Sequence, residues 1–123
     1  EVFYSHLQLA RISNVWEDVF KWCIKAYEMI SRVEPLLIIV EHYLMKRNFH
    51  MAYLFINTAY HLEYPKNQGL FIDNNSYEYK RYHLMARIAW YVGQKEIGRE
   101  ACIKAIIAKN RDIDKHNLKF YES

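Results

Sequence analysis

Apolar residues recur at helical spacing along almost the whole chain, and this periodicity constrains the fold more than any other feature. Only 3 Gly and 2 Pro interrupt it among 123 residues, and such a shortage of turn-forming residues disfavours an all-β fold. Because 52% of the residues are hydrophobic, the chain can bury a core without disulfides or metals. The sequence therefore predicts an all-α domain.

Six main helices and a short C-terminal helix are expected from this periodicity and from the turn-forming residues between its stretches. They span about 2–12, 16–30, 34–46, 49–62, 77–92, 95–109 and 112–121. Pro35 suits the first turn of the third helix, and Gly93 suits the end of the fifth. Ser76 is expected to cap the start of the fifth helix, and Asp112 or Asp114 the start of the last one.

The helices fall into three pairs whose second members can be superimposed on a small residue near their ends. Ala26 and Ala59 are 33 residues apart, and Ala59 and Ala105 are 46 apart, which is one repeat plus an insertion at 65–76. A period near 34, with small residues where paired helices cross closely, is typical of tetratricopeptide repeats. We therefore expect a single domain, 1–123, with a tetratricopeptide-like right-handed superhelix of three helix pairs (about 1–32, 33–64 and 77–109) plus the C-terminal helix. The alternative is a generic helical bundle with accidental periodicity.

The insertion is expected to form a loop, because Pro, Gly and several Asn residues break the helical period there. Residues 70–72 are apolar and are expected to be extended and packed on the helices. Tyr77 and Tyr79 stand beside the insertion and are expected to hold this apolar segment in place.

Eight short segments follow one another in an order that is more specific than the repeat period. They are 33–36 (VEPL), 51–55 (MAYLF), 64–66 (YPK), 70–73 (LFID), 77–80 (YEYK), 91–93 (YVG), 100–102 (EAC) and 117–120 (NLKF). In this order they resemble a tetratricopeptide domain attached to family-2-type glycosyltransferases of bacteria and large DNA viruses. The resemblance covers nearly all of the chain, although the turn around 13–15 is shorter than that family leads us to expect. It implies that this chain, which begins at Glu1 rather than Met, is an accessory part of a longer protein.

Catalytic and metal-binding motifs are missing from the sequence. It has no Gly-rich phosphate loop and no HExxH arrangement among its six histidines. Residues 73–75 lack the alternating ligands of a calcium loop. Cys23 and Cys102 are far apart in apolar helical stretches, so they are expected to be buried free thiols. We predict no catalytic residue, no metal and no cofactor.

A binding groove is the expected functional feature, because the first helix of each pair lines the concave side of such repeats. The residues expected on that side are Tyr4, Arg11, Glu41, Met45, Lys80, His83, Arg87, Trp90 and Tyr91. Arginine and aromatic side chains together suit recognition of an acidic peptide, a phosphate or a sugar. The alternative is that Trp90 and Tyr91 pack under the sixth helix and that the charges form a solvated surface.

The expected function is a non-catalytic interaction module, the accessory domain of a glycosyltransferase, that contacts a protein, a peptide or the parent's catalytic domain. Open ends of a repeat stack also allow self-association. The net charge of +3 is too small to favour nucleic acid, and the longest apolar run, 35–40, is too short to span a membrane. Because no signal-peptide pattern is visible, we expect a cytoplasmic location. A free-standing adaptor, a nucleic-acid-binding helical repeat and a small enzyme remain as alternatives.

Overall fold

The computed structural model describes residues 2–63 and 73–122, which form helices and no strand. The helices are α1 (Val2–Ile12), α2 (Trp16–Met29), α3 (Val33–Met45), α4 (Phe49–His61), α5 (Arg81–Ala89), α6 (Lys95–Ala108) and α7 (Asp112–Glu122). A π-helical turn, η1 (Ser76–Lys80), and a 3₁₀ turn, η2 (Trp90–Val92), extend α5 at its two ends. The all-α prediction is confirmed, and the observed helical runs agree with the predicted spans to within three residues. The apolar segment 70–72, expected to pack on the helices, lies outside the described residues.

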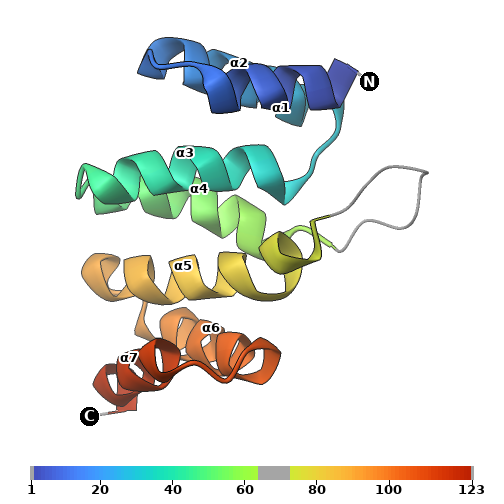
Figure 1. Ribbon diagram of the computed structural model, residues 1–123. Coiled ribbons are helices and arrows are strands. Elements are labelled where there is room, and N and C mark those ends of the chain that lie inside the picture. Colours follow the sequence, from blue (N-terminus) through green and yellow to red (C-terminus); the bar gives the residue numbers. More distant parts are fainter. Residues whose placement is uncertain (1, 64–72, 123) are drawn as a thin grey trace.

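Consecutive helices form three hairpins that stack in chain order (Figure 1). They are α1–α2, α3–α4 and α5–α6; α2 packs on α3, and α4 packs on α5. The last helix, α7, packs mainly on α6, where Leu118 contacts the largest core cluster while Phe120 stays half-exposed. Contacts between hairpins thus run mainly between neighbours in the stack, as in helical repeats.

Small residues lie where helices approach closely. The three alanines used for the repeat alignment, Ala26, Ala59 and Ala105, are fully buried. Gly98 is also buried, and a Cβ atom added to it would lie 2.4 Å from the ring of Tyr121 on α7. A larger side chain at these positions would push the helices apart, so the small residues set the interhelical distances.

The turns within the second and third hairpins share one backbone conformation. Arg47 and Gly93 adopt the left-handed conformation, with φ angles of 57° and 77°. The amide of the next residue then donates to a carbonyl five residues back, at 2.9 Å in the first turn and 3.0 Å in the second. This pattern closes the preceding helix, and glycine is the usual residue at its left-handed position. The sequence indicated Gly93 for this role, whereas Arg47 was not expected to take the same conformation.

The predicted cap Ser76 is wrong, and of the two alternatives for the last helix, Asp112 or Asp114, the second is excluded. Ser76 lies inside the helical run, because residues 74 and 75 are already helical. The cap is Asp73, whose carboxylate accepts from the Ser76 amide at 3.4 Å and from its hydroxyl at 2.9 Å. A carboxylate is also favoured at the positive end of a helix. Asp114 is fully buried and accepts from side chains of the α5 region, so the last helix begins with Asp112 instead.

Candidate binding cleft

A cleft of about 260 Å³ lies where the turn of the second hairpin and the end of α5 meet α7. It is lined by Leu44, Arg47, Phe49, Ala86, Arg87, Trp90, Tyr91, Asn117, Phe120 and Tyr121. Three residues predicted for the groove, Arg87, Trp90 and Tyr91, are therefore brought together here. The α3–α4 turn and α7 supply most of the other lining residues.

Aromatic rings form much of the cleft wall. The Tyr91 ring stacks on that of Phe49 from α4, with 3.9 Å between centroids. The Trp90 ring makes edge contacts with Phe120 and Tyr121 of α7, at 6.2 and 5.4 Å. Nevertheless Trp90, Tyr91 and Phe120 remain 38%, 53% and 51% exposed, so these rings present apolar surface to solvent.

The cleft carries positive charge without a matching negative charge. The Arg47 guanidinium lies 5.2 Å from the ring centroid of Phe49 and 5.8 Å from that of Tyr91, which are cation–π distances. Arg87 is exposed on α5. Neither arginine forms an ion pair with any described residue, and none of the ten lining residues is acidic. The cleft therefore suits a ligand that brings an anion.

The other six residues predicted for the groove lie outside this cleft. Two of them meet each other, because Lys80 of η1 forms a half-exposed ion pair with Glu41 of α3 at 3.1 Å. Arg11 is exposed on α1, and Met45 at the end of α3 is 86% exposed. None of these four residues lines the cleft.

His83, expected on the groove, instead connects α5 to α7. Its Nδ1 donates to the buried carboxylate of Asp114 at 2.6 Å, and the Tyr79 hydroxyl donates to the same carboxylate at 2.7 Å. Burial and this hydrogen bond raise the pKa of Tyr79 to about 12. Tyr79 thus has an observed structural role in holding α7, which the sequence did not indicate.

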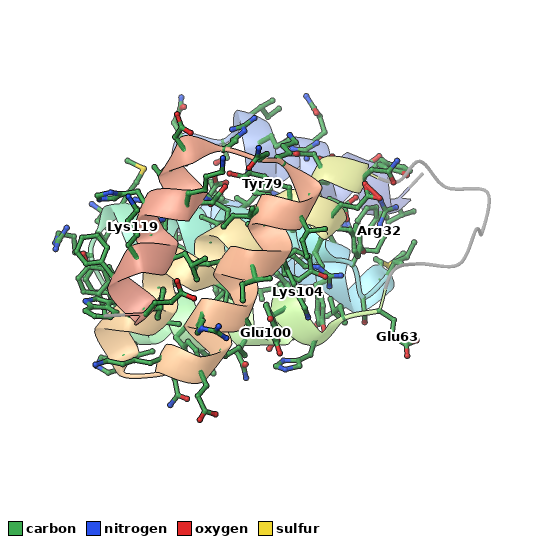
Figure 2. All side chains as sticks on the ribbon, turned by 90° about the horizontal axis from the view of Figure 1, so that it is seen from below. Arg32, Glu63, Tyr79, Glu100, Lys104 and Lys119 are labelled. Carbon is green, nitrogen blue, oxygen red and sulfur yellow. The ribbon has the colours of Figure 1, made fainter. Side chains whose placement is uncertain are left out.

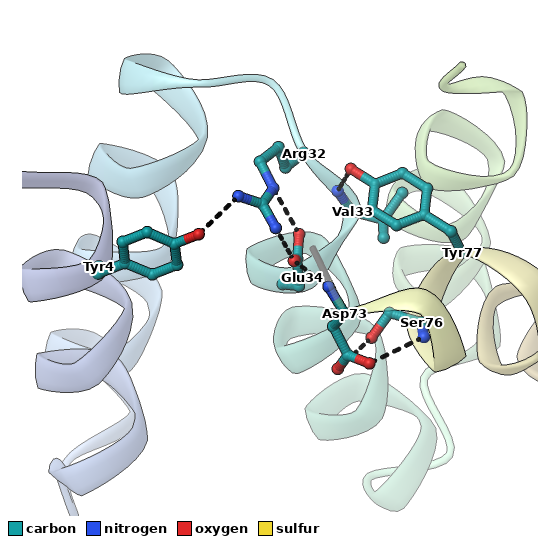
Figure 3. Close-up of polar contacts among 7 residues, drawn as sticks. All are labelled: Tyr4, Arg32, Val33, Glu34, Asp73, Ser76 and Tyr77. Carbon is teal, nitrogen blue, oxygen red and sulfur yellow. Dashed lines mark hydrogen bonds and ion pairs between the residues drawn. The ribbon is translucent and has the colours of Figure 1, made fainter. Parts of the chain in front are cut away.

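Tyr4, also expected on the groove, belongs to a buried polar network where α3 begins, at the other end of the hairpins from the cleft (Figure 3). Its hydroxyl accepts from Arg32 at 3.2 Å, and the same guanidinium makes a bidentate ion pair with Glu34. The hydroxyl of Tyr77 accepts from the Val33 amide at 3.1 Å in the same region. The network joins α1, α3 and η1, so its polar groups hold the hairpins together.

Charged side chains on the outer face of α6, Glu100 and Lys104 among them, have partners within the protein (Figure 2). Glu100 accepts from the Tyr60 hydroxyl and lies 3.5 Å from the ammonium of Lys104. The hydrogen bond from Tyr60 is the main cause that lowers the pKa of Glu100. Lys104 also lies over the rings of Tyr60 and Tyr82, at 5.0 and 5.3 Å. Unlike the cleft, this face has partners for both of these charges.

A larger hollow, about 740 Å³, lies between η1 and α6. It is lined in part by Arg81, whose guanidinium is hydrogen-bonded within the fold. Arg81 is buried, and its guanidinium donates to the carbonyls of Ala59, Leu62 and Tyr77 at 3.0, 2.5 and 2.8 Å. Two of these bonds go to the end of α4, where carbonyls lack the usual amide donor four residues on. The arginine therefore stabilises the fold and is not offered to a ligand.

The remaining chemistry-bearing residues occupy structural positions. Cys23 and Cys102 are buried free thiols, as predicted, and burial raises the pKa of each to about 12. His42 stacks on Trp16 with 3.5 Å between centroids, and desolvation lowers its pKa. In the described part of the chain, no group of three or more His, Cys, Asp or Glu could hold a metal ion, and no helix could span a membrane.

Sequence reasoning missed Arg47, Phe49, Asn117 and Phe120 as cleft residues. One available signal was the alignment of the two hairpin turns, which places Arg47 opposite Gly93 and so marks it as an unusual residue for its backbone. The contribution of α7 had no such signal, because it depends on where that helix packs.

The described residues thus form an all-α stack of helix hairpins with a cleft lined by arginine and aromatic side chains. Comparisons with models of protein families, with curated proteins and with solved structures give no match to this chain. The tetratricopeptide assignment and the link to glycosyltransferases therefore stay expectations from the sequence.

Proposed function

We propose that this chain is a non-catalytic helical-repeat interaction module whose cleft holds a segment of a partner protein. The observation that carries the proposal is the combination of exposed aromatic rings and unpaired arginines in one concavity. Tryptophan, tyrosine and arginine are the residues enriched at the energetic centres of protein interfaces. Here Trp90, Tyr91 and Arg87 lie at one site, where a partner would bury them together.

The module is proposed to be a tetratricopeptide-like right-handed superhelix that accompanies a glycosyltransferase in the cytoplasm. Support comes from the ordered series of sequence segments, the stacking of hairpins, and the buried small residues at the predicted crossings. The reading frame on both sides of 1–123 tests this part. An upstream α/β domain with an Asp-x-Asp motif is expected. A frame without any catalytic domain would leave a free-standing adaptor and remove the glycosyltransferase association.

A selection from a phage-displayed library of random 12-residue peptides tests the interaction function without assuming a partner. Enriched peptides should bind the wild-type chain and lose at least about tenfold in affinity to Trp90→Ala or Tyr91→Ala, since interface aromatics carry much of the binding energy. Lys104→Ala is the matched control, because it removes an exposed side chain that contacts aromatic rings on the outer face of α6. Circular dichroism would establish that all variants are folded.

Two results would overturn the interaction proposal. The first is a selection that enriches no peptide over the starting library. The second is a set of peptides that bind Trp90→Ala and Tyr91→Ala as tightly as the wild-type chain, because these peptides would use a different surface.

A further inference from the structure

Arg47 occupies a backbone position that the neighbouring hairpin gives to glycine. Both Arg47 and Gly93 are left-handed, and the hydrogen bonds that close the two turns are equivalent. A residue with a Cβ atom is disfavoured in this conformation, and glycine or asparagine is the usual choice. Turn stability therefore does not explain an arginine at this position. An observed backbone outlier of this kind is a reason to look for a function.

The surroundings of Arg47 leave its hydrogen-bonding groups available. The guanidinium lies over the stacked rings of Phe49 and Tyr91, and its side chain makes no hydrogen bond or ion pair to a described residue. Contact with ring faces holds a guanidinium in place while leaving its in-plane N–H groups free to bind an anion. The Arg47 guanidinium is thus held in place by the rings, while its N–H groups have no partner among the described residues.

The other lining residues and the volume of the cleft limit the kind of ligand that it can bind. Arg87 adds a second cation, Asn117 adds an amide, and no lining residue is acidic. Trp90 and Phe120 supply exposed aromatic surface in the same concavity. At about 260 Å³ the space falls below the roughly 300–1,000 Å³ of pockets for drug-sized ligands. It therefore fits one or two side chains of a peptide rather than a nucleotide or a large cofactor.

We infer that the cleft binds a peptide segment in which a carboxylate lies next to an aromatic side chain. Arg47, assisted by Arg87, binds the carboxylate, and the ligand's ring packs against Trp90 and Phe120. A guanidinium matches a carboxylate with two parallel hydrogen bonds, which gives the site its preference for this anion. The inference rests on the proposed interaction function and names the chemistry of its partner.

N-acetylphenylalanine is a suitable probe, because it carries one carboxylate and one ring. Titration into ¹⁵N-labelled protein, followed by NMR through the arginine Nε–Hε signals, should shift the signals of Arg47 and Arg87. A ligand of this size is expected to bind with a dissociation constant of roughly 1 mM. The uncharged amide of the same compound and acetate, which lacks the ring, should each bind at least about fivefold more weakly.

Arg47→Gly separates recognition from folding. The variant keeps the left-handed turn, so it should unfold at the same urea concentration as the wild-type chain or at a higher one. It should also weaken N-acetylphenylalanine binding at least about fivefold, whereas Lys46→Ala, a change at the neighbouring exposed cation, should leave binding unchanged. Arg47→Lys should retain part of the affinity, because it keeps the charge but not the planar fork.

Three outcomes would overturn the inference. Equal affinities for the acid and its amide would exclude a carboxylate site. Unchanged binding in Arg47→Gly would show that this arginine does not contact the ligand, and a lowered urea midpoint would show that it is retained for stability. Peptides selected at the cleft without any acidic residue would overturn the ligand chemistry alone, whereas a failed peptide selection would remove the interaction function itself.

Discussion

Removing either member of the buried Arg32–Glu34 pair is expected to destabilise the protein far more than removing both. The two side chains are 2% and 4% exposed, and the Arg32 Nε donates to Glu34 Oε1 at 3.1 Å (Figure 3). Burial alone lowers the pKa of Arg32, but the hydrogen bonds to Tyr4 and Glu34 and the charge of Glu34 raise it overall. The charge of each group is therefore compensated by the other inside the fold.

The expected magnitudes follow from this mutual compensation. Arg32→Met or Glu34→Leu leaves one buried charge without its partner, which costs about 3–5 kcal/mol of unfolding free energy. The double variant buries no charge, and it loses mainly the bonds to the Tyr4 hydroxyl and the Asp73 amide, so its cost is about 0–2 kcal/mol. The coupling free energy between the two sites is then at least about 3 kcal/mol.

Urea unfolding followed by tryptophan fluorescence and circular dichroism measures these free energies. At about 0.05–0.15 kcal/mol per residue, a chain of 123 residues has roughly 6–18 kcal/mol available, so single variants should stay folded in the absence of urea. Tyr4→Phe is the control, because it removes one hydrogen bond and leaves the ion pair. Additive costs, within about 0.5 kcal/mol, would refute the reasoning, since independent sites behave in that way.

Three other substitutions or conditions test the fold. Arg81→Met should lower the unfolding free energy by about 3–5 kcal/mol in urea, because the carbonyls of Ala59, Leu62 and Tyr77 lose the guanidinium that donates to them; a loss below about 1 kcal/mol would contradict this role. Gly98→Ala should lower the urea midpoint despite better helix propensity, worth about 1 kcal/mol, because its Cβ would lie 2.4 Å from the Tyr121 ring; a raised midpoint would show that Tyr121 moves aside without cost. Since the pKa values of Cys23 and Cys102 rise from 9.0 to about 12 in the folded chain, unfolded thiols ionise first. Stability should therefore fall as pH increases from 9 towards 12, less steeply in a Cys23→Ala/Cys102→Ala variant, and iodoacetamide at pH 8.5 should react only after urea is added.

The helices could be predicted from the sequence because their signals are local. Apolar spacing, turn residues such as Gly93, and buried alanines at a regular interval each report on residues close together in the chain. The errors concern polar groups whose partners are distant. Asp114 could be mistaken for a cap, because nothing near it reveals that Tyr79 and His83, more than thirty residues earlier, donate to it.

The groove was only partly predictable for the same reason. Spacing along one helix correctly grouped Arg87 with Trp90 and Tyr91, which line the cleft together. It also placed His83 with them, although that side chain is used by α7. Which residues of a helix face remain open depends on the next element in the stack, and the packing of α7 cannot be obtained from helical periodicity.

Three buried charges and the cleft lie towards opposite ends of the hairpins, whose helices Figure 1 shows. The buried charges Arg32, Glu34 and Arg81 lie where α3 and α5 begin, and each is compensated within the fold. Arg47 and Arg87 lie towards the other end, in a cleft without acidic residues. Sites this far apart with no shared partner should respond independently to substitution. Arg47→Gly should therefore weaken binding without lowering stability, Glu34→Leu should lower stability without weakening binding, and each variant serves as the control for the other.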